Sequence, residues 1–125
     1  MPPIEVVGQG EASYSEYTIK ATIIRLQKSF LLLVSDQPEF GIGTVTLSAP
    51  PAMSGLDAAS SPFNIFGMKN NLLANLLGKM ASKHLNSPVL SLVFILDEKL
   101  KPEIIMKTAV EAVKKAIDDK STQNK

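Results

Sequence analysis

The most uniform hydrophobic pattern in the chain lies at residues 30–34, where FLLLV is apolar at every position. Successive side chains of a β-strand point to opposite faces of the sheet, so an unbroken apolar strand needs cover on both faces. The preceding segment EYTIKATIIRL, residues 16–26, alternates partly, and GTVTLSA, residues 43–49, alternates cleanly. These patterns predict a hairpin followed by a further strand, with IEVVG at residues 4–8 as a short first strand.

The second half of the chain predicts two helices separated by one strand. NNLLANLLGKMASKHLN, residues 70–86, has leucines at helical spacing, and its first asparagines are preferred N-cap residues. SPVLSLVFIL, residues 87–96, predicts a strand that is again apolar on both faces. Pro102 then opens a helix at the first-turn position that favours proline, and its apolar stripe ends at Ile117.

This order of elements predicts one α+β domain spanning residues 1–125. We expect an antiparallel β-sheet of about five to six strands with two α-helices, in the order ββββ-α-β-α. Residues 50–69, rich in proline, serine, glycine and alanine, predict a flexible loop. Residues 118–125 predict a disordered tail.

Two helices are too few to cover both faces of such a sheet. A helix is about 10 Å wide and strands lie about 4.8 Å apart, so each helix covers about two strands of one face. We therefore expect the other face of the apolar strands to pair with another chain. Alternation puts Leu31 and Leu33 on one face and their neighbours on the other, but it does not determine which face pairs.

The composition narrows the functional classes. With no cysteine, the chain has no disulfide framework and no thiolate metal site, which fits a reducing compartment. We find no signal-peptide pattern and no apolar run of membrane-spanning length, so we expect a soluble intracellular protein without membrane contact. Its expected location is the cytoplasm, and the nucleus is left open as a further location. A net charge of +1 gives no reason to expect a nucleic-acid partner.

Motifs that carry catalysis are scarce in this sequence. His84 is the only histidine, and it lies on the apolar side of a predicted helix. The glycine pairs GQG, residues 8–10, and GIG, residues 41–43, lack the third glycine of a phosphate-binding motif and are interpreted as turn glycines. These observations predict a protein that is not an enzyme and has no catalytic residue, cofactor or metal.

Charge and exposed apolar residues suggest further contact sites. Residues 69–125 carry ten basic and six acidic residues, whereas residues 1–68 carry three basic and six acidic residues. Lys107 and Lys114 lie on the last helix, either as a solvated face or as contacts for an acidic partner. In the long loop, the apolar FNIFGM that contains Phe63 and Phe66 either packs under the first helix or becomes ordered on a partner.

Several of these features occur together in a known family. IIRLQKSFLLLV, a proline-containing turn, a small-residue strand, a long polar loop, NLLANLLGKMASKHLNSPVLSLVFI and a closing amphipathic helix follow one another over residues 15–117. This arrangement resembles the proteasome assembly chaperone 4 family, with the sister family, proteasome assembly chaperone 3, as its closest rival. The resemblance covers most of the chain and rests on the order of elements and the hairpin pattern.

The resemblance implies a non-enzymatic chaperone for assembly of the 20S proteasome core particle. Such a protein acts as a heterodimer with the sister chaperone, binds an alpha-type subunit, promotes alpha-ring formation and leaves as beta-type subunits arrive. We then expect Leu31, Leu33, Phe63, Phe66, Lys107 and Lys114 to be partner-interface residues.

Other classes remain open at this point. One is a longin-like or roadblock-like adaptor scaffold, although a roadblock-type chain places a helix between its early strands. Another is a small ligand-binding domain or enzyme whose pocket is lined by the second apolar face. The sequence also leaves open whether the isolated chain is a monomer or a homodimer.

Overall fold

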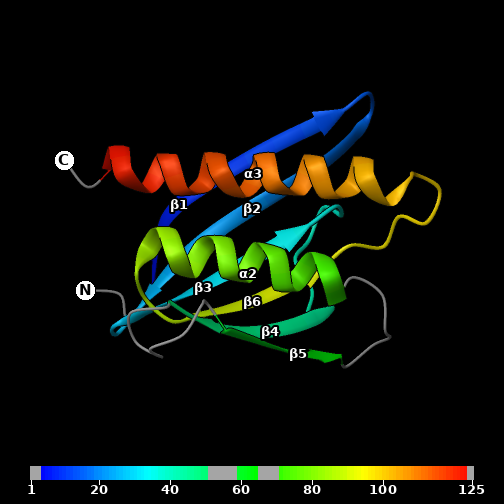
Figure 1. Ribbon diagram of the computed structural model, residues 1–125. Coiled ribbons are helices and arrows are strands. Elements are labelled where there is room, and N and C mark those ends of the chain that lie inside the picture. Colours follow the sequence, from blue (N-terminus) through cyan, green and yellow to red (C-terminus); the bar gives the residue numbers. More distant parts are fainter. Residues whose placement is uncertain (1–3, 51–58, 65–70, 124–125) are drawn as a thin grey trace.

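The computed structural model describes residues 4–50, 59–64 and 71–123, with only the backbone described for 59–64 and 121–123 (Figure 1). These residues form six strands and two helices. The strands are β1 (Glu5–Tyr14), β2 (Tyr17–Leu26), β3 (Ser29–Ser35), β4 (Thr44–Ala49), β5 (Ala59–Asn64) and β6 (Val89–Phe94). The helices are α2 (Asn71–Leu85) and α3 (Pro102–Gln123).

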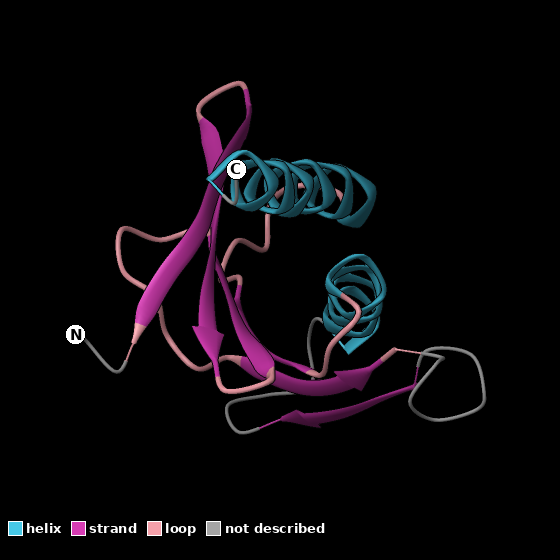
Figure 2. Ribbon diagram, turned by 90° about the vertical axis from the view of Figure 1, so that its left-hand side faces the viewer, coloured by secondary structure: helices cyan, strands magenta, loops and turns pink. Residues whose placement is uncertain are grey.

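The strands form one sheet in the order β1-β2-β3-β6-β4-β5. Both helices lie on the same side of it, with α3 packed on β1 and β2 and α2 packed on β4, β5 and β6 (Figures 1 and 2). The predicted α+β fold with two helices is therefore confirmed. The sheet is mixed rather than wholly antiparallel, because β6 returns through α2 and pairs in parallel with β3.

Two predicted segments differ in detail from the structure. The sequence predicts residues 50–69 as a loop, but strand β5 lies inside this range. Its backbone pairs with β4 and extends the sheet by one strand. Helix α3 continues to Gln123 through most of the predicted tail 118–125. Asp119, inside that region, accepts a hydrogen bond from Gln9 N at 2.9 Å, so contact with β1 supports the helix there.

Glycines explain how closely α3 packs on β1. Gly8 and Gly10 lie inside the strand rather than in a turn, which corrects the interpretation of GQG. A Cβ atom at Gly10 would collide with the Ala112 carbonyl oxygen, and one at Gly8 would collide with that of Ala116. Small residues on both elements therefore bring the helix backbone against the strand. In contrast, Gly43 has φ of 58°, as expected for a turn glycine.

The core lies between the sheet and the two helices, and its composition differs beneath each helix. Beneath α3 it is apolar, with fully buried side chains such as Ile19, Ile23 and Val113. Beneath α2 the strands present hydroxyl groups, and Thr46, Ser48 and Ser91 are buried without a hydrogen-bond partner in the described part of the chain.

Candidate protein interface on the open sheet face

The sheet face turned away from α2 and α3 carries no described helix (Figure 2). In β3, Leu32 and Val34 are fully buried beneath the helices, whereas Leu31 and Leu33 lie on the opposite face and remain partly accessible. The predicted alternation of FLLLV is confirmed, and the structure identifies which leucines belong to the uncovered side. We call this side the open face, formed by the positions of β1 to β4 and β6 that share the side of Leu31.

Strand register aligns apolar side chains in rows across the open face. Each residue in a row lies directly opposite the next one on the neighbouring strand. The first row consists of Val6, Ile24, Leu31, Leu90 and Leu47. The second row consists of Gln9, Thr22, Leu33, Leu92 and Val45. Leu47 is 57% exposed and Val6 is 46% exposed, so the first row is apolar across five strands and still in contact with solvent.

The size of this surface suits a protein contact. Five strands spaced about 4.8 Å apart, with two rows that span about four residues or about 13 Å along each strand, give a projected area on the order of 300 Å². The largest apolar patch of a typical monomer is about 300–600 Å² and is often functional, so a surface of this extent suits an interaction site. Neither row contains a charged side chain, so little charge desolvation opposes burial of its centre.

The loop of residues 36–43 closes one end of the open face, and Asp36 anchors it. The Asp36 carboxylate accepts hydrogen bonds from the Tyr17 hydroxyl at 3.0 Å and from the backbone N–H of Asp97 at 3.0 Å, and it also binds Leu96 N. Burial raises the pKa of Tyr17 above its ordinary value, and the Asp36 carboxylate raises it further. Tyr17 therefore stays protonated as a donor, and the end of β3 is joined to the end of β6.

Beyond Asp36 the loop covers a third row of the sheet, in which Lys20 lies opposite Ser35 and Ser35 lies opposite Phe94. Lys20 Nζ donates to the Pro38 carbonyl oxygen and lies 4.9 Å from the centre of the Phe40 ring. A Cβ at Gly41 would approach the Phe94 ring to 2.7 Å, so this glycine permits contact with the ring. The loop thus limits the accessible apolar area to the first two rows. The sequence predicted a turn here, but not this anchoring.

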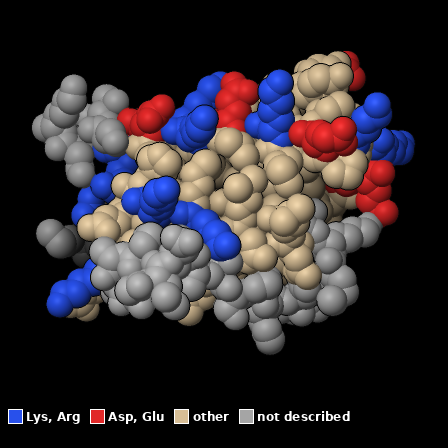
Figure 3. All heavy atoms as spheres, viewed as in Figure 1, with Lys and Arg blue, Asp and Glu red and all other residues tan. Residues whose placement is uncertain are grey.

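The remaining predicted interface residues lie elsewhere. Lys107 and Lys114 are exposed on α3, in the helix layer on the other side of the sheet from Leu31. Figure 3 shows acidic and basic side chains interspersed along this side of the molecule. The strand position of Phe63 pairs with Val45 at the sheet edge, but its side chain is not described. Phe66 lies outside the described residues.

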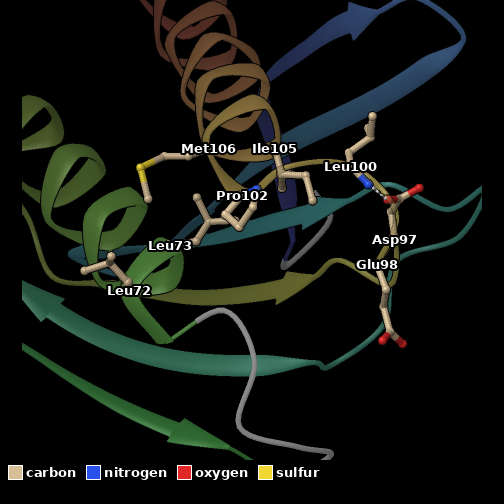
Figure 4. Close-up of a pocket in the computed structure, with 8 residues that line it drawn as sticks. All are labelled: Leu72, Leu73, Asp97, Glu98, Leu100, Pro102, Ile105 and Met106. Atoms are coloured by element: carbon tan, nitrogen blue, oxygen red, sulfur yellow. Dashed lines mark hydrogen bonds between the residues drawn. The ribbon is translucent and has the colours of Figure 1, made fainter.

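An apolar hollow lies between the N-terminal ends of α2 and α3, away from the open face (Figure 4). It has a volume of about 450 Å³. Its apolar lining consists of Leu72, Leu73, Leu100, Pro102, Ile105 and Met106. Asp97 and Glu98 complete the lining, and Asp97 Oδ1 accepts the backbone N–H groups of Lys99 and Leu100, both at 2.9 Å. Asp97 therefore organises the turn before α3.

Two further observations concern metals and membranes. Across residues 4–50, 59–64 and 71–123, no three His, Cys, Asp or Glu side chains are grouped in a way that could hold a metal ion. No helix in the described ranges combines the length and apolar character needed to cross a membrane.

Comparison with known proteins identifies the fold. No family model and no curated protein matches the sequence. Among solved structures, the chain is similar to one in the crystal structure of a chaperone complex for yeast 20S proteasome assembly. The TM-score is 0.67 at 13% sequence identity, and the match covers 98% of this chain and 98% of that chain. At this identity the likeness shows a common architecture over the full length.

Proposed function

We propose that this protein is a non-enzymatic chaperone for assembly of the 20S proteasome core particle. The observation that carries the proposal is an uncovered apolar sheet face on a chain whose whole length has the fold of a proteasome assembly chaperone subunit. Among the described residues, the rows of Leu31 and Leu33 offer a broad apolar surface for a protein.

The open face is the proposed contact with a sister chaperone, giving a heterodimer. Packing a second apolar sheet on the rows of Leu31 and Leu33 would bury apolar area worth about 25 cal/mol per Å², before the losses of association are subtracted. Leu47 and Leu90 lie opposite each other on β4 and β6 and are among the more exposed leucines of the chain, so they are expected to contribute strongly.

The proposed contact with an alpha-type subunit uses a different surface. The outer side of α3 remains free when the open face is covered, because the helices and the open face lie on opposite sides of the sheet. Lys107 and Lys114 are exposed there and are suited to acidic residues on the subunit. Charged contacts of this kind guide association and still allow release when the beta-type subunits arrive. The segment that contains Phe63, at the end of β5, and Phe66 is a second proposed contact.

The alternative function is the binding of a small ligand, and the apolar hollow between α2 and α3 favours it. The hollow in Figure 4 is large and apolar enough for a small molecule. Its lining supplies only two ionisable side chains, Asp97 and Glu98. Asp97 already serves the adjacent turn, so few polar groups remain to orient a ligand.

The proposal can be tested by affinity capture of the tagged chain from its native cytoplasm, followed by mass spectrometry. The wild-type chain should recover a sister chaperone and an alpha-type subunit. Leu31→Asp should reduce recovery of the sister chaperone by more than tenfold, because it places a charge in the middle of the first row. Leu72→Asp is the matched control, since Leu72 is 73% exposed on α2 in the helix layer.

Two outcomes would contradict the proposal. One is a wild-type chain that recovers no chaperone and no core-particle subunit. The other is equal recovery of the sister chaperone by Leu31→Asp and Leu72→Asp, which would move the contact away from the open face.

A further inference from the structure

A polar hollow borders the open face on the side of β1. It has a volume of about 410 Å³, and the side chains around it are those of Gln9, Glu11, Lys20, Thr22 and Phe40. Gln9 lies opposite Thr22, and Glu11 lies opposite Lys20, in the pairing of β1 with β2. Thr22 in turn lies opposite Leu33 on β3. The hollow therefore continues the second row of the open face towards the sheet edge.

Of the two charged side chains in this hollow, Lys20 has partners in the loop and Glu11 does not. Lys20 would be the natural partner of Glu11 across the two strands. Its ammonium group instead donates to the Pro38 carbonyl oxygen and lies over the Phe40 ring. Among the described residues, the Glu11 carboxylate makes no ion pair and no hydrogen bond. Because Lys20 interacts with the loop of residues 36–43, the Glu11 carboxylate is left without a cationic partner at the margin of the apolar open face.

The position of Glu11 is itself well defined. Its backbone carbonyl oxygen accepts a hydrogen bond from Lys115 Nζ at 3.1 Å, which fixes β1 to α3 at this residue. Thr22 and Gln9 line the same hollow as Glu11, and their side chains carry further acceptor oxygens. A group of acceptors around one carboxylate suits a ligand with several N–H donors and a positive charge, such as a guanidinium or ammonium group.

Covering the open face with another sheet would partly remove this carboxylate from water. Such desolvation is unfavourable unless the partner supplies a cation. A second copy of this chain is poorly equipped to do so. Lys20 is the only lysine or arginine at an open-face position of the described strands, and the loop already holds its ammonium group.

We propose that Glu11 and the hollow around it select the partner of the open face, by receiving an arginine or lysine side chain from the partner's sheet and by disfavouring pairing between two copies. That the partner sheet belongs to a sister chaperone rests on the proposed function. The unfavourable effect of Glu11 on pairing between two copies of this chain does not depend on the proposed function. Charges at an interface margin act mainly on association rate, register and the rejection of wrong partners.

Self-association of the purified chain provides the first test. Glu11→Gln keeps the size of the side chain and removes its charge, so sedimentation should show a self-association Kd about three- to tenfold lower than that of the control. The control is Glu16→Gln in the turn between β1 and β2, which changes the net charge by the same amount at another exposed carboxylate. The difference should shrink in high salt, where exposed charges are screened.

Equal sedimentation behaviour of Glu11→Gln and Glu16→Gln, including two variants that both remain monomeric, would overturn the inference. Thermal unfolding of both variants establishes that the fold is intact before the comparison is made.

Capture of the sister chaperone provides the second test and separates the two proposals. Glu11→Lys should recover about tenfold less sister chaperone than Glu16→Lys, because two cations would then meet at the margin. If Leu31→Asp abolishes capture while Glu11→Lys and Glu16→Lys recover equal amounts, the open face is the interface and the role of Glu11 is wrong. If the wild-type chain captures no sister chaperone, the proposed function fails, and the self-association test still decides whether Glu11 disfavours self-pairing.

Discussion

The two helices of this protein cover the same sheet in different ways. Helix α3 contacts β1 through glycine and alanine, with its backbone against Gly8 and Gly10 and apolar side chains filling the space over β2. Helix α2 lies over a layer of hydroxyl groups, and its Gly78 faces the Ser48 hydroxyl. Fully buried side chains occur at both interfaces, such as Ile19 and Val113 beneath α3 and Thr46 and Ser91 beneath α2. Equal burial therefore does not imply equal stability, because a buried hydroxyl without a partner opposes folding by about 1–3 kcal/mol.

The comparison predicts that the α2 side of the molecule opens more readily than the α3 side. Local opening requires less free energy where fewer apolar contacts and hydrogen bonds are lost. When α2 separates from the sheet, the hydroxyls of Thr46 and Ser91 regain hydrogen bonds with water. When α3 separates, apolar surface is exposed and the contacts of Asp119 and Lys115 with β1 are lost.

The largest expected effect comes from breaking the close contact of α3. Gly10→Val should destabilise the protein by about 3 kcal/mol, because the new side chain would collide with the Ala112 backbone. Gln9→Val is the matched control, since this neighbouring side chain points to the open face and should change stability by less than about 0.5 kcal/mol. Urea unfolding followed by circular dichroism measures both. Similar stabilities for the two variants would contradict the close packing of α3 on β1.

A smaller effect of opposite sign is expected beneath α2. Thr46→Val removes a buried hydroxyl that has no partner in the described chain, so it should stabilise the α2 interface by about 1 kcal/mol. Hydrogen exchange of the α2 amides should then slow about fivefold.

Thr108→Val is the control for this change in the other half of the molecule. The Thr108 hydroxyl donates to the Ile104 carbonyl oxygen at 2.8 Å, so its removal should not slow exchange in α3. Faster exchange of the α2 amides in Thr46→Val would show that this hydroxyl stabilises the native state.

The smallest effect is expected where the two halves are joined, at the contact between Tyr17 and Asp36. Because the pKa of Tyr17 is raised in the folded protein, the folded state holds this proton more tightly than the unfolded chain does. The contribution of Tyr17 is therefore present below pH 10 and is lost as the pH rises above it. The free energy of unfolding, measured with urea, should decline from about pH 9 to about pH 11 less steeply in Tyr17→Phe than in the wild type. This range brackets the ordinary tyrosine pKa of about 10. Identical slopes would contradict the assignment.

Local patterns predicted much of the fold. The alternation of residues 16–26, the apolar run at 30–34 and the spacing of the leucines in α2 all gave the correct element. The run at 30–34 did not identify its buried face, and two leucines of the α2 pattern, Leu72 and Leu76, are 73% and 38% exposed. The central position of β6 could not be predicted in this way. A strand that is apolar on both faces can pair with several others, and its parallel pairing with β3 depends on the path of the chain through α2.

The features missed around the open face depend on contacts between distant residues. Asp36 was part of a predicted turn, but its partners include the backbone of Leu96 and Asp97, whose N–H groups carry no sequence signal. Gly8 and Gly10 were interpreted as turn glycines because a strand glycine that faces a helix has the same local pattern. Glu11 was not singled out, since its significance depends on Lys20 being held by the loop.

The parallel pairing of β3 with β6 also affects how the chain reaches its native state. Phe30 pairs with Val89, so the centre of the sheet cannot form until most of the sequence has left the ribosome. Contacts between residues so far apart slow folding, because a long segment must be ordered before the pairing forms. The meander of β1, β2 and β3 is synthesised first and has apolar side chains on both faces. Until α3 is complete, we expect this segment to be the part of the nascent chain most prone to aggregation.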